Sequence, residues 1–329
     1  MTKGTKAPKA IAAERFVGVI PPLVLPLDRT GQIDFDSLDR QIDFLLAAGV
    51  DGLWVNGTTG DFFALDDDER GRVVAAAVRR SGGRVPVIAQ AGDTATRRAI
   101  AHGHRALEAG ADAVAVVLPY YLDYSQQELK AHYRAVRRAI GMPLFLYQLP
   151  QMCKVALSIE SIVELAQDGT LIGIKDSAGD VDFYYRLVRA VAKAGVVLRC
   201  FYGASALIDV GLYVGGHGVM SAIANLVPHL CRQAYAEAAA GRWSEARATH
   251  GRILDLIEAL RLPGRPNWAP TVAVYKWLLC QLEIIQHDGV FEPLQPLSGA
   301  EQDHLRARAL PLMKELCAGL VPRGSVPSA

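Results

Sequence analysis

Lys175 closes an apolar segment, Leu171–Ile174, so its amine is expected to be held away from bulk water. Desolvation lowers the pKa of a lysine, and a useful fraction of the side chain is then the neutral, nucleophilic amine. Such an amine is a candidate catalytic nucleophile. Position alone leaves open a second interpretation, in which the lysine reaches water or pairs with Asp176.

Two further segments carry groups that would assist this chemistry. Tyr147 lies near the end of the apolar segment Leu144–Gln148. The ends of adjacent parallel strands lie about 5 Å apart, so a phenol there can move protons for the amine. Alternatively, the tyrosine packs at the rim of a barrel, with its hydroxyl bonded to a neighbour. Residues 57–60 read Gly-Thr-Thr-Gly and offer N–H groups and hydroxyls that suit a carboxylate. An ordinary glycine-flanked turn between a strand and a helix would have the same residues.

These residues need a scaffold of short, buried strands. Continuous apolar runs are typical of parallel strands that are covered on both faces. The candidate strands are Val17–Pro26, Gly52–Asn56, Val85–Gln90, Ala113–Leu118, Leu144–Gln148, Leu171–Lys175, Val197–Tyr202 and Gly218–Ser221. Because amphipathic segments alternate with them, we predict an α/β fold, a closed (β/α)8 TIM barrel. An open doubly wound sheet is the alternative, but no G-x-G-x-x-G follows the first strand.

Helix signals separate the strands and continue beyond them. Residues 66–69 and 125–128 have the spacing of capping boxes, and Gly49 and Gly110 stand where a helix would end. After Gly241 the strand pattern stops, and a C-terminal helical extension is expected. Its predicted helices are Arg242–Leu262, Ala269–Ile285 and Gly299–Gly319.

We therefore divide the chain into a catalytic barrel and a helical subdomain, with a tail at each end. Residues 320–325 read Leu-Val-Pro-Arg-Gly-Ser, which resembles a thrombin-cleavage linker, and the last tail is set aside for that reason. The predicted parts are an N-terminal tail at 1–15, the barrel at 16–240, the helical subdomain at 241–319 and the C-terminal tail at 320–329.

Charge and cysteine content limit the function classes. The net charge is +1, from 35 basic and 34 acidic residues, which gives no electrostatic reason to expect nucleic acid or an anionic membrane. The 5 cysteines are scattered without a C-x-x-C pair, so a disulfide framework is not expected and a reducing cytoplasm is. The start of the chain lacks the apolar region of a signal peptide. No H-E-x-x-H motif occurs, and we expect neither a metal nor an organic cofactor.

Several motifs, each after a predicted strand end, resemble those of one enzyme family. Taken together, they are similar to the dihydrodipicolinate synthase / N-acetylneuraminate lyase family of class I aldolases, over nearly the whole chain. The matching segments are Gly-Thr-Thr-Gly-Asp at 57–61, Pro-Tyr-Tyr at 119–121, Tyr-Gln-Leu-Pro at 147–150, Gly-Ile-Lys-Asp-Ser at 173–177, and Gly-Val-Met-Ser at 218–221 with Asn225.

The resemblance implies roles for individual residues. Lys175 would form a Schiff base with pyruvate or another 2-oxo acid, and Tyr147 would act as acid and base. Thr58 would link Tyr147 to Tyr121, which a second subunit would supply across an interface. The chain would then be a homo-oligomer, a dimer or a homotetramer built as a dimer of dimers. Residues that would contact the substrate are Gly57, Thr59, Met152, Gly203 and Met220.

Departures from the family pattern concern the substrate. Met152 stands where dihydrodipicolinate synthases carry an arginine for the carboxylate of their aldehyde substrate, and Lys154 is no ready substitute for a guanidinium. Ala204 and Ser205 stand where sialic-acid lyases carry acidic residues. Residues 60–65 bear some likeness to deoxyketosugar-acid dehydratases. We therefore favour a lyase that cleaves, condenses or dehydrates a 2-keto-3-deoxy acid-type substrate.

Three alternatives stay open. The first is dihydrodipicolinate synthase itself, which joins pyruvate and aspartate semialdehyde. The second is a relative that binds a 2-oxo acid without turnover. The third is a metal-dependent barrel aldolase, which sensitivity to EDTA would reveal.

Overall fold

The computed structural model describes residues 13–265 and 269–319. This part of the chain contains a single eight-stranded sheet whose strands are short and almost entirely buried. In chain order the strands are β1 (Gly18–Val19), β2 (Leu53–Val55), β3 (Val87–Gln90), β4 (Ala113–Val117), β5 (Leu144–Gln148), β6 (Gly173–Asp176), β7 (Arg199–Tyr202) and β8 (Gly218–Val219).

The sheet closes on itself. All neighbouring strands are parallel, in the order β1-β8-β7-β6-β5-β4-β3-β2. The segment after β1 then joins β2, because the Trp54 N–H donates to the Pro21 carbonyl at 3.0 Å and the Leu23 N–H donates to the Trp54 carbonyl at 2.8 Å. This closure confirms the predicted (β/α)8 barrel and rules out an open doubly wound sheet.

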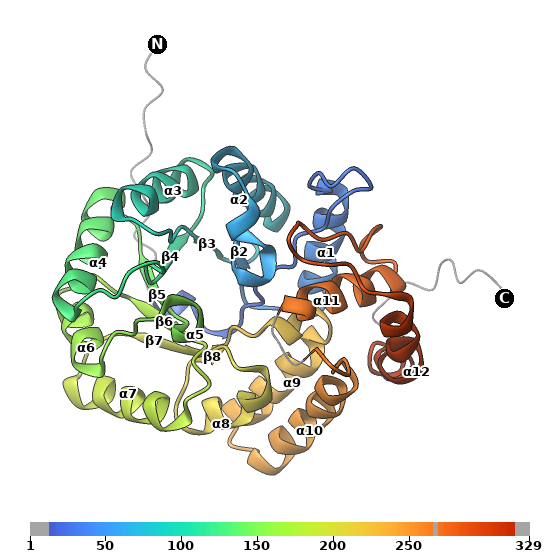
Figure 1. The fold of residues 1–329 in the computed structure, drawn as a ribbon. Coiled ribbons are helices and arrows are strands. Elements are labelled where there is room, and N and C mark those ends of the chain that lie inside the picture. Colours follow the sequence, from blue (N-terminus) through green and yellow to red (C-terminus); the bar gives the residue numbers. More distant parts are fainter. Residues whose placement is uncertain (1–12, 266–268, 320–329) are drawn as a thin grey trace.

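Helices form a ring outside the strands (Figure 1). Each covers the barrel with an apolar face, which is the standard way in which a parallel sheet is shielded from water. The helices of this ring are α1 (Phe35–Ala47), α2 (Asp67–Ser81), α3 (Thr96–Glu108), α4 (Gln126–Ile140), α6 (Ile159–Gln167), α7 (Val181–Ala194), α8 (Ile208–Tyr213) and α9 (Pro228–Ala239), and the short α5 (Pro150–Cys153) follows β5.

The local signals in the sequence explain where several of these helices begin and end. Asp66 and Ser125 cap α2 and α4, and each forms the predicted capping box with the glutamate three residues later. Gly49 and Gly110 have φ values of 77° and 88°. That left-handed conformation favours glycine and ends a helix. These predictions are confirmed.

The C-terminal helices pack beside the first and last helices of the barrel, as the lower right of Figure 1 shows. They are α10 (Trp243–Ala259), α11 (Ala269–Gln281) and α12 (Gly299–Leu316), each slightly shorter than predicted. One hydrophobic cluster joins Leu38 of α1 and Leu230 of α9 to Ile253, Leu278 and Leu305 of the three C-terminal helices. Because barrel and extension share this cluster, the domain boundary at residues 240 and 241 stays a prediction.

The first strand is much shorter than the predicted Val17–Pro26. The Ile20 N–H still donates to the Val219 carbonyl at 2.9 Å, but Pro21 and Pro22 follow. Proline has no N–H to donate, so the ladder toward β8 cannot continue through these residues. The same prolines leave only one bridge to β2, at Pro22 and Trp54.

The predicted tails fall largely outside the described residues. Residues 1–12 and 320–329 lie outside the described residues. The last residues of the predicted N-terminal tail form a short 3-10 helix, Ala13–Arg15, and Arg15 pairs with Asp112 at 3.2 Å.

Candidate active site

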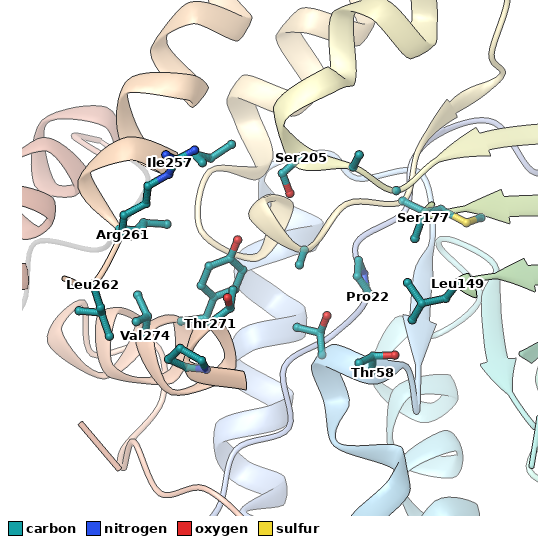
Figure 2. Close-up of a pocket in the computed structure, with 18 of the residues that line it drawn as sticks. Pro22, Thr58, Leu149, Ser177, Ser205, Ile257, Arg261, Leu262, Thr271 and Val274 are labelled. Carbon is teal, nitrogen blue, oxygen red and sulfur yellow. The ribbon is translucent and has the colours of Figure 1, made fainter. Parts of the chain in front are cut away.

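A cavity of about 810 Å³ lies at the carboxyl ends of the strands. Figure 2 shows its walls, with Ser177 and Leu149 from the barrel on one side and Arg261 and Leu262 on the other. In a barrel of this kind, the loops that follow the strands build the active site. The predicted site residues that line this cavity are Thr58, Thr59, Tyr147, Lys175, Gly203 and Met220.

Lys175 lies on β6 and is 4% exposed. Burial lowers the pKa of its amine from 10.5 to about 7. Among the described residues, no carboxylate oxygen lies within 4.0 Å of Lys175 Nζ. Aromatic faces contact the amine instead, with the ring centre of Tyr147 at 4.4 Å and that of Trp54 at 4.7 Å. The sequence alternative in which Lys175 pairs with Asp176 is therefore wrong.

Asp176 is buried on the opposite face of the same strand, as alternation along a strand requires. The Ala178 N–H donates to its Oδ1 at 2.9 Å, and Oδ2 has no partner in the described part of the chain. Burial raises the pKa of Asp176 to about 6.

Tyr147 lies on β5 and is the register partner of Lys175 on β6. Its hydroxyl lies 3.2 Å from Thr58 Oγ1, and either oxygen can donate that hydrogen bond. Burial raises the pKa of Tyr147 to about 12, while hydrogen bonds from the Thr58 and Ser177 hydroxyls oppose the rise. The phenol is therefore protonated at neutral pH and is connected to a second hydroxyl, as a proton carrier would be.

The segment after β2 forms two short 3-10 turns, Thr58–Gly60 and Phe62–Ala64. Thr59 is buried against the cavity, and the N–H groups of Gly60 and Asp61 are already used by carbonyls within the turn. Gly57 does not line the cavity; a Cβ there would lie 2.8 Å from the Trp54 indole nitrogen. The structure thus brings Thr58 and Thr59 to the site and gives Gly57 a packing reason to lack a side chain.

Asp61 anchors this turn to the C-terminal helices. Its Oδ2 accepts from Lys276 Nζ at 2.9 Å, and both side chains are fully buried. Burial raises the pKa of Asp61 and lowers the pKa of Lys276, and the attraction between the two charges opposes both shifts. Lys276 lies on α11, directly after the cavity residue Tyr275, so this ion pair ties one wall of the cavity to the turn that carries Thr58.

Gly203 and Met220 line the cavity on the other side of Lys175. A Cβ at Gly203 would collide with Ser177 Oγ, so the glycine lets these two loops meet. Ser205 also lines the cavity, and its hydroxyl is hydrogen-bonded to that of Ser221.

Besides Gly57, two predicted site residues do not reach this cavity. Met152 is 49% exposed and lines a neighbouring apolar cavity of about 270 Å³, which shares Thr58 and Leu149 with the larger one. Tyr121 is 74% exposed, and no hydrogen bond joins it to Thr58 in the described part of this chain. A role for Tyr121 therefore requires a second subunit, and that role stays a prediction.

Sequence reasoning missed the wall that the C-terminal helices supply. Arg261 and Arg265 flank a Pro-Gly turn after α10, and each has an acidic partner at 3.0 Å, Glu258 and Glu301 respectively. The only available signal was a pair of arginines in a turn between two helices. Trp54 was missed as well, because a tryptophan in a buried strand normally indicates packing alone.

The described residues offer no cluster for a metal and no membrane span. No group of three or more His, Cys, Asp or Glu side chains gathers within residues 13–265 and 269–319. Within the same ranges, every helix is too short or too polar to cross a lipid bilayer.

Comparison with known proteins agrees with this architecture. The model of the dihydrodipicolinate synthetase family matches residues 15–310. A 4-hydroxy-tetrahydrodipicolinate synthase of Thiobacillus denitrificans is 36% identical over 290 residues, which cover 88% of this chain and 95% of that protein.

Solved structures give the same result. Dihydrodipicolinate synthase from Thermotoga maritima has a TM-score of 0.84 at 29% identity and covers 93% of this chain and 99% of its own. YagE of E. coli K12, a protein of the dihydrodipicolinic acid synthase family solved with pyruvate, has a TM-score of 0.84 at 28% identity, with coverage of 92% and 98%. The chain therefore belongs to the dihydrodipicolinate synthetase family and is a lyase of that family.

Proposed function

We propose that the enzyme forms a Schiff base between Lys175 and pyruvate or another 2-oxo acid. The observation that carries the proposal is a buried amine with a pKa of about 7, facing a large cavity beside the Tyr147–Thr58 pair. At neutral pH much of this amine is uncharged and able to attack a carbonyl carbon. An exposed lysine, with a pKa above 10, would be mostly protonated under the same conditions.

The chemistry follows from the protonation states. The neutral amine adds to the keto carbon, the carbonyl oxygen takes up protons and leaves as water, and a protonated imine remains. Tyr147 holds its proton at neutral pH and can pass it to that oxygen, with Thr58 as its hydrogen-bond partner. The protonated imine then accepts the electron pair released by C–C cleavage. Alternatively, it loses a proton from the adjacent carbon to Tyr147 and becomes an enamine, which attacks an aldehyde or expels a hydroxyl group as water. We propose no metal or organic cofactor.

The remaining site residues would hold the substrate. We assign its carboxylate to Thr59 and the turn after Gly57, and its keto end to the wall formed by Gly203 and Met220. Tyr121 would come from a second subunit, since it is exposed on its own chain. This part of the proposal makes the enzyme a homo-oligomer, a dimer or a dimer of dimers, and we place it in the cytoplasm.

The second substrate is the finer part of the proposal. Met152 offers no guanidinium for the carboxylate of aspartate semialdehyde, and its cavity is apolar. We therefore favour a 2-keto-3-deoxy acid-type substrate in an aldolase or dehydratase reaction. Dihydrodipicolinate synthase activity is the second candidate, because the 36% identical Thiobacillus protein bears the name 4-hydroxy-tetrahydrodipicolinate synthase.

Borohydride capture tests the imine. Pyruvate with borohydride should leave a stable adduct on the Lys175 peptide, because reduction converts the imine to an amine. Lys175→Met should lose the adduct. The matched variant Lys154→Met, which replaces an exposed lysine directly after α5, should keep it. Label on other lysines but not on Lys175 would overturn the proposal.

A substrate panel separates the remaining alternatives. Aldehydes with pyruvate and 2-keto-3-deoxy acids should give a change in pyruvate, with equal rates before and after treatment with EDTA. An adduct without turnover across the panel would favour a 2-oxo-acid-binding protein. Activity that disappears with EDTA would favour a metal-dependent aldolase.

A further inference from the structure

Trp54 is a fully buried tryptophan whose ring contacts the amine of Lys175. It lies on β2, across the barrel interior from β6, with its ring centre 4.7 Å from Lys175 Nζ. The Tyr147 ring lies on another side of the same nitrogen, and the two rings meet at 77° with their centres 5.4 Å apart. The amine therefore occupies a corner between two aromatic faces.

The electrostatic surroundings of this corner are unusual for a buried cation. In the described part of the chain, no acidic side chain lies within 4.0 Å of Lys175 Nζ, and the adjacent Asp176 is bonded to the Ala178 N–H instead. A tryptophan face carries negative charge density and attracts a cation within about 6 Å of the ring centre. The aromatic faces are thus the groups that compensate a positive charge on Lys175.

The indole of Trp54 has a fixed position, and its N–H group has no hydrogen-bond partner among the described residues. Its backbone closes the barrel by bonding to Pro21 and Leu23, which fixes where the side chain points. Gly57 leaves space for it, because a Cβ there would lie 2.8 Å from the indole nitrogen. That nitrogen is buried and has no hydrogen-bond partner among the described residues. Buried tryptophan N–H groups usually have a partner, so packing alone would be served better by phenylalanine or leucine.

We propose that Trp54 is a catalytic residue, whose indole face stabilises the positive charge that forms on Lys175 Nζ when the imine is made. The inference rests on the proposed Schiff base. A neutral amine, a keto group and one proton give the protonated imine and water, so one unit of positive charge appears on a nitrogen that lies over the indole. Stabilising that charge favours formation of the protonated imine. More of the substrate is then present in the form that accepts the electron pair of the bond that breaks.

Fluorinated tryptophan separates this role from simple packing. Successive fluorine atoms withdraw charge density from the ring face and change the shape of the indole very little. The protein is prepared with tryptophan and with mono-, di- and trifluorinated tryptophan. For each form, the fraction of protein that borohydride traps at Lys175 is measured at increasing concentrations of pyruvate. We expect the concentration of pyruvate for half-maximal trapping to rise stepwise with each fluorine.

Two variants serve as controls, because the analogue replaces all 4 tryptophans. Trp277→Phe removes another fully buried tryptophan, on α11, and should keep the stepwise dependence. Trp54→Phe should abolish the dependence and weaken trapping by roughly 2- to 30-fold, the range that cation–π contacts span from exposed to desolvated sites. If Trp54→Phe is unstable, the fluorine series is measured instead in a variant that carries phenylalanine at 243, 268 and 277, in which Trp54 is the one tryptophan left.

The outcomes distinguish this inference from the proposed function. Trapping at Lys175 that is the same with tryptophan and with all the fluorinated forms would overturn the role of Trp54 and leave the Schiff base intact. Absence of any pyruvate adduct on Lys175 in the unaltered protein would overturn both. A stepwise dependence that survives in Trp54→Phe would assign the effect to another tryptophan and overturn this inference.

Discussion

Tyr147 and Lys175 are register partners on β5 and β6, and Lys175 Nζ lies 4.4 Å from the centre of the Tyr147 ring. The amine thus contacts the face of the phenol, while the hydroxyl at the edge of the ring is bonded to Thr58. One side chain therefore makes two separable contacts. Its face contacts the amine, and its hydroxyl is hydrogen-bonded to a second hydroxyl.

Tyr147→Phe tests the hydroxyl alone, because the aromatic face remains. We expect turnover to fall by roughly 10²- to 10⁴-fold, the usual effect of removing a positioned acid or base. The measurement is steady-state kinetics with the best substrate of the panel. Tyr133→Phe is the matched control, since it removes a buried hydroxyl that donates to the Val116 carbonyl at 2.9 Å without lining the cavity. Near-normal turnover in Tyr147→Phe would reduce Tyr147 to a packing residue.

The pKa of Lys175 predicts the acid side of the pH profile. Only the neutral amine attacks, so kcat/KM should rise with pH through about 7 and then level off. Asp176, whose pKa burial raises to about 6, is the other group that titrates nearby. Asp176→Asn should therefore leave the rise near pH 7 in place. A rise that disappears in this variant would assign it to Asp176.

The same group links stability to pH. In the unfolded chain a lysine keeps its proton up to about pH 10.5, but in the folded protein Lys175 releases it at about 7. Between these values the unfolded state binds more protons, so the free energy of unfolding contributed by this group rises with pH. Urea denaturation of the unaltered protein and of Lys175→Met across pH 7–9 measures the contribution. The variant should lose this part of the pH dependence.

The sequence predicts the barrel half of the site well. Lys175 and Tyr147 end apolar strands, and adjacent parallel strands bring their ends together in any barrel of this type. The wall that contains Arg261 and Arg265 follows from the packing of α10 and α11 against the barrel mouth, which no local pattern specifies. The contact of Trp54 with Lys175 depends on which face of β2 points inward and on register across the barrel. Neither can be predicted from the three apolar residues of β2 (Leu53–Val55).

The Asp61–Lys276 ion pair predicts a large effect on stability. Lys276→Met leaves a fully buried carboxylate without its partner, which typically costs about 3–5 kcal/mol. Urea denaturation measures the free energy of unfolding, with exposed Lys314→Met as the control. Asp61 has a φ of 52°, which asparagine tolerates, so Asp61→Asn can be added without new backbone strain. The double variant should recover part of the loss. A double variant that is no more stable than Lys276→Met would contradict this interpretation.

The last prediction concerns the second substrate, at Met152. A thioether cannot donate a hydrogen bond, whereas a charge-assisted bond to a carboxylate is typically worth about 1.5–3 kcal/mol, or roughly 10- to 150-fold in kcat/KM. We therefore expect poor turnover of pyruvate with aspartate semialdehyde, and better turnover with a substrate whose distal part is less charged. Met152→Arg should raise activity toward the semialdehyde, and Met152→Leu, which keeps the apolar surface, should not.

The native rate decides whether Met152 controls this preference. A kcat/KM with aspartate semialdehyde near or above about 10⁴ M⁻¹s⁻¹, the lower end of ordinary enzyme efficiency, would refute the prediction. Another donor would then have to hold the carboxylate. Lys154 is exposed and lines neither of the two cavities described above, whereas Arg265 lines the larger one and is held there by Glu301 at 3.0 Å. Arg265→Gln should in that case raise KM for the semialdehyde and leave capture of pyruvate at Lys175 unchanged.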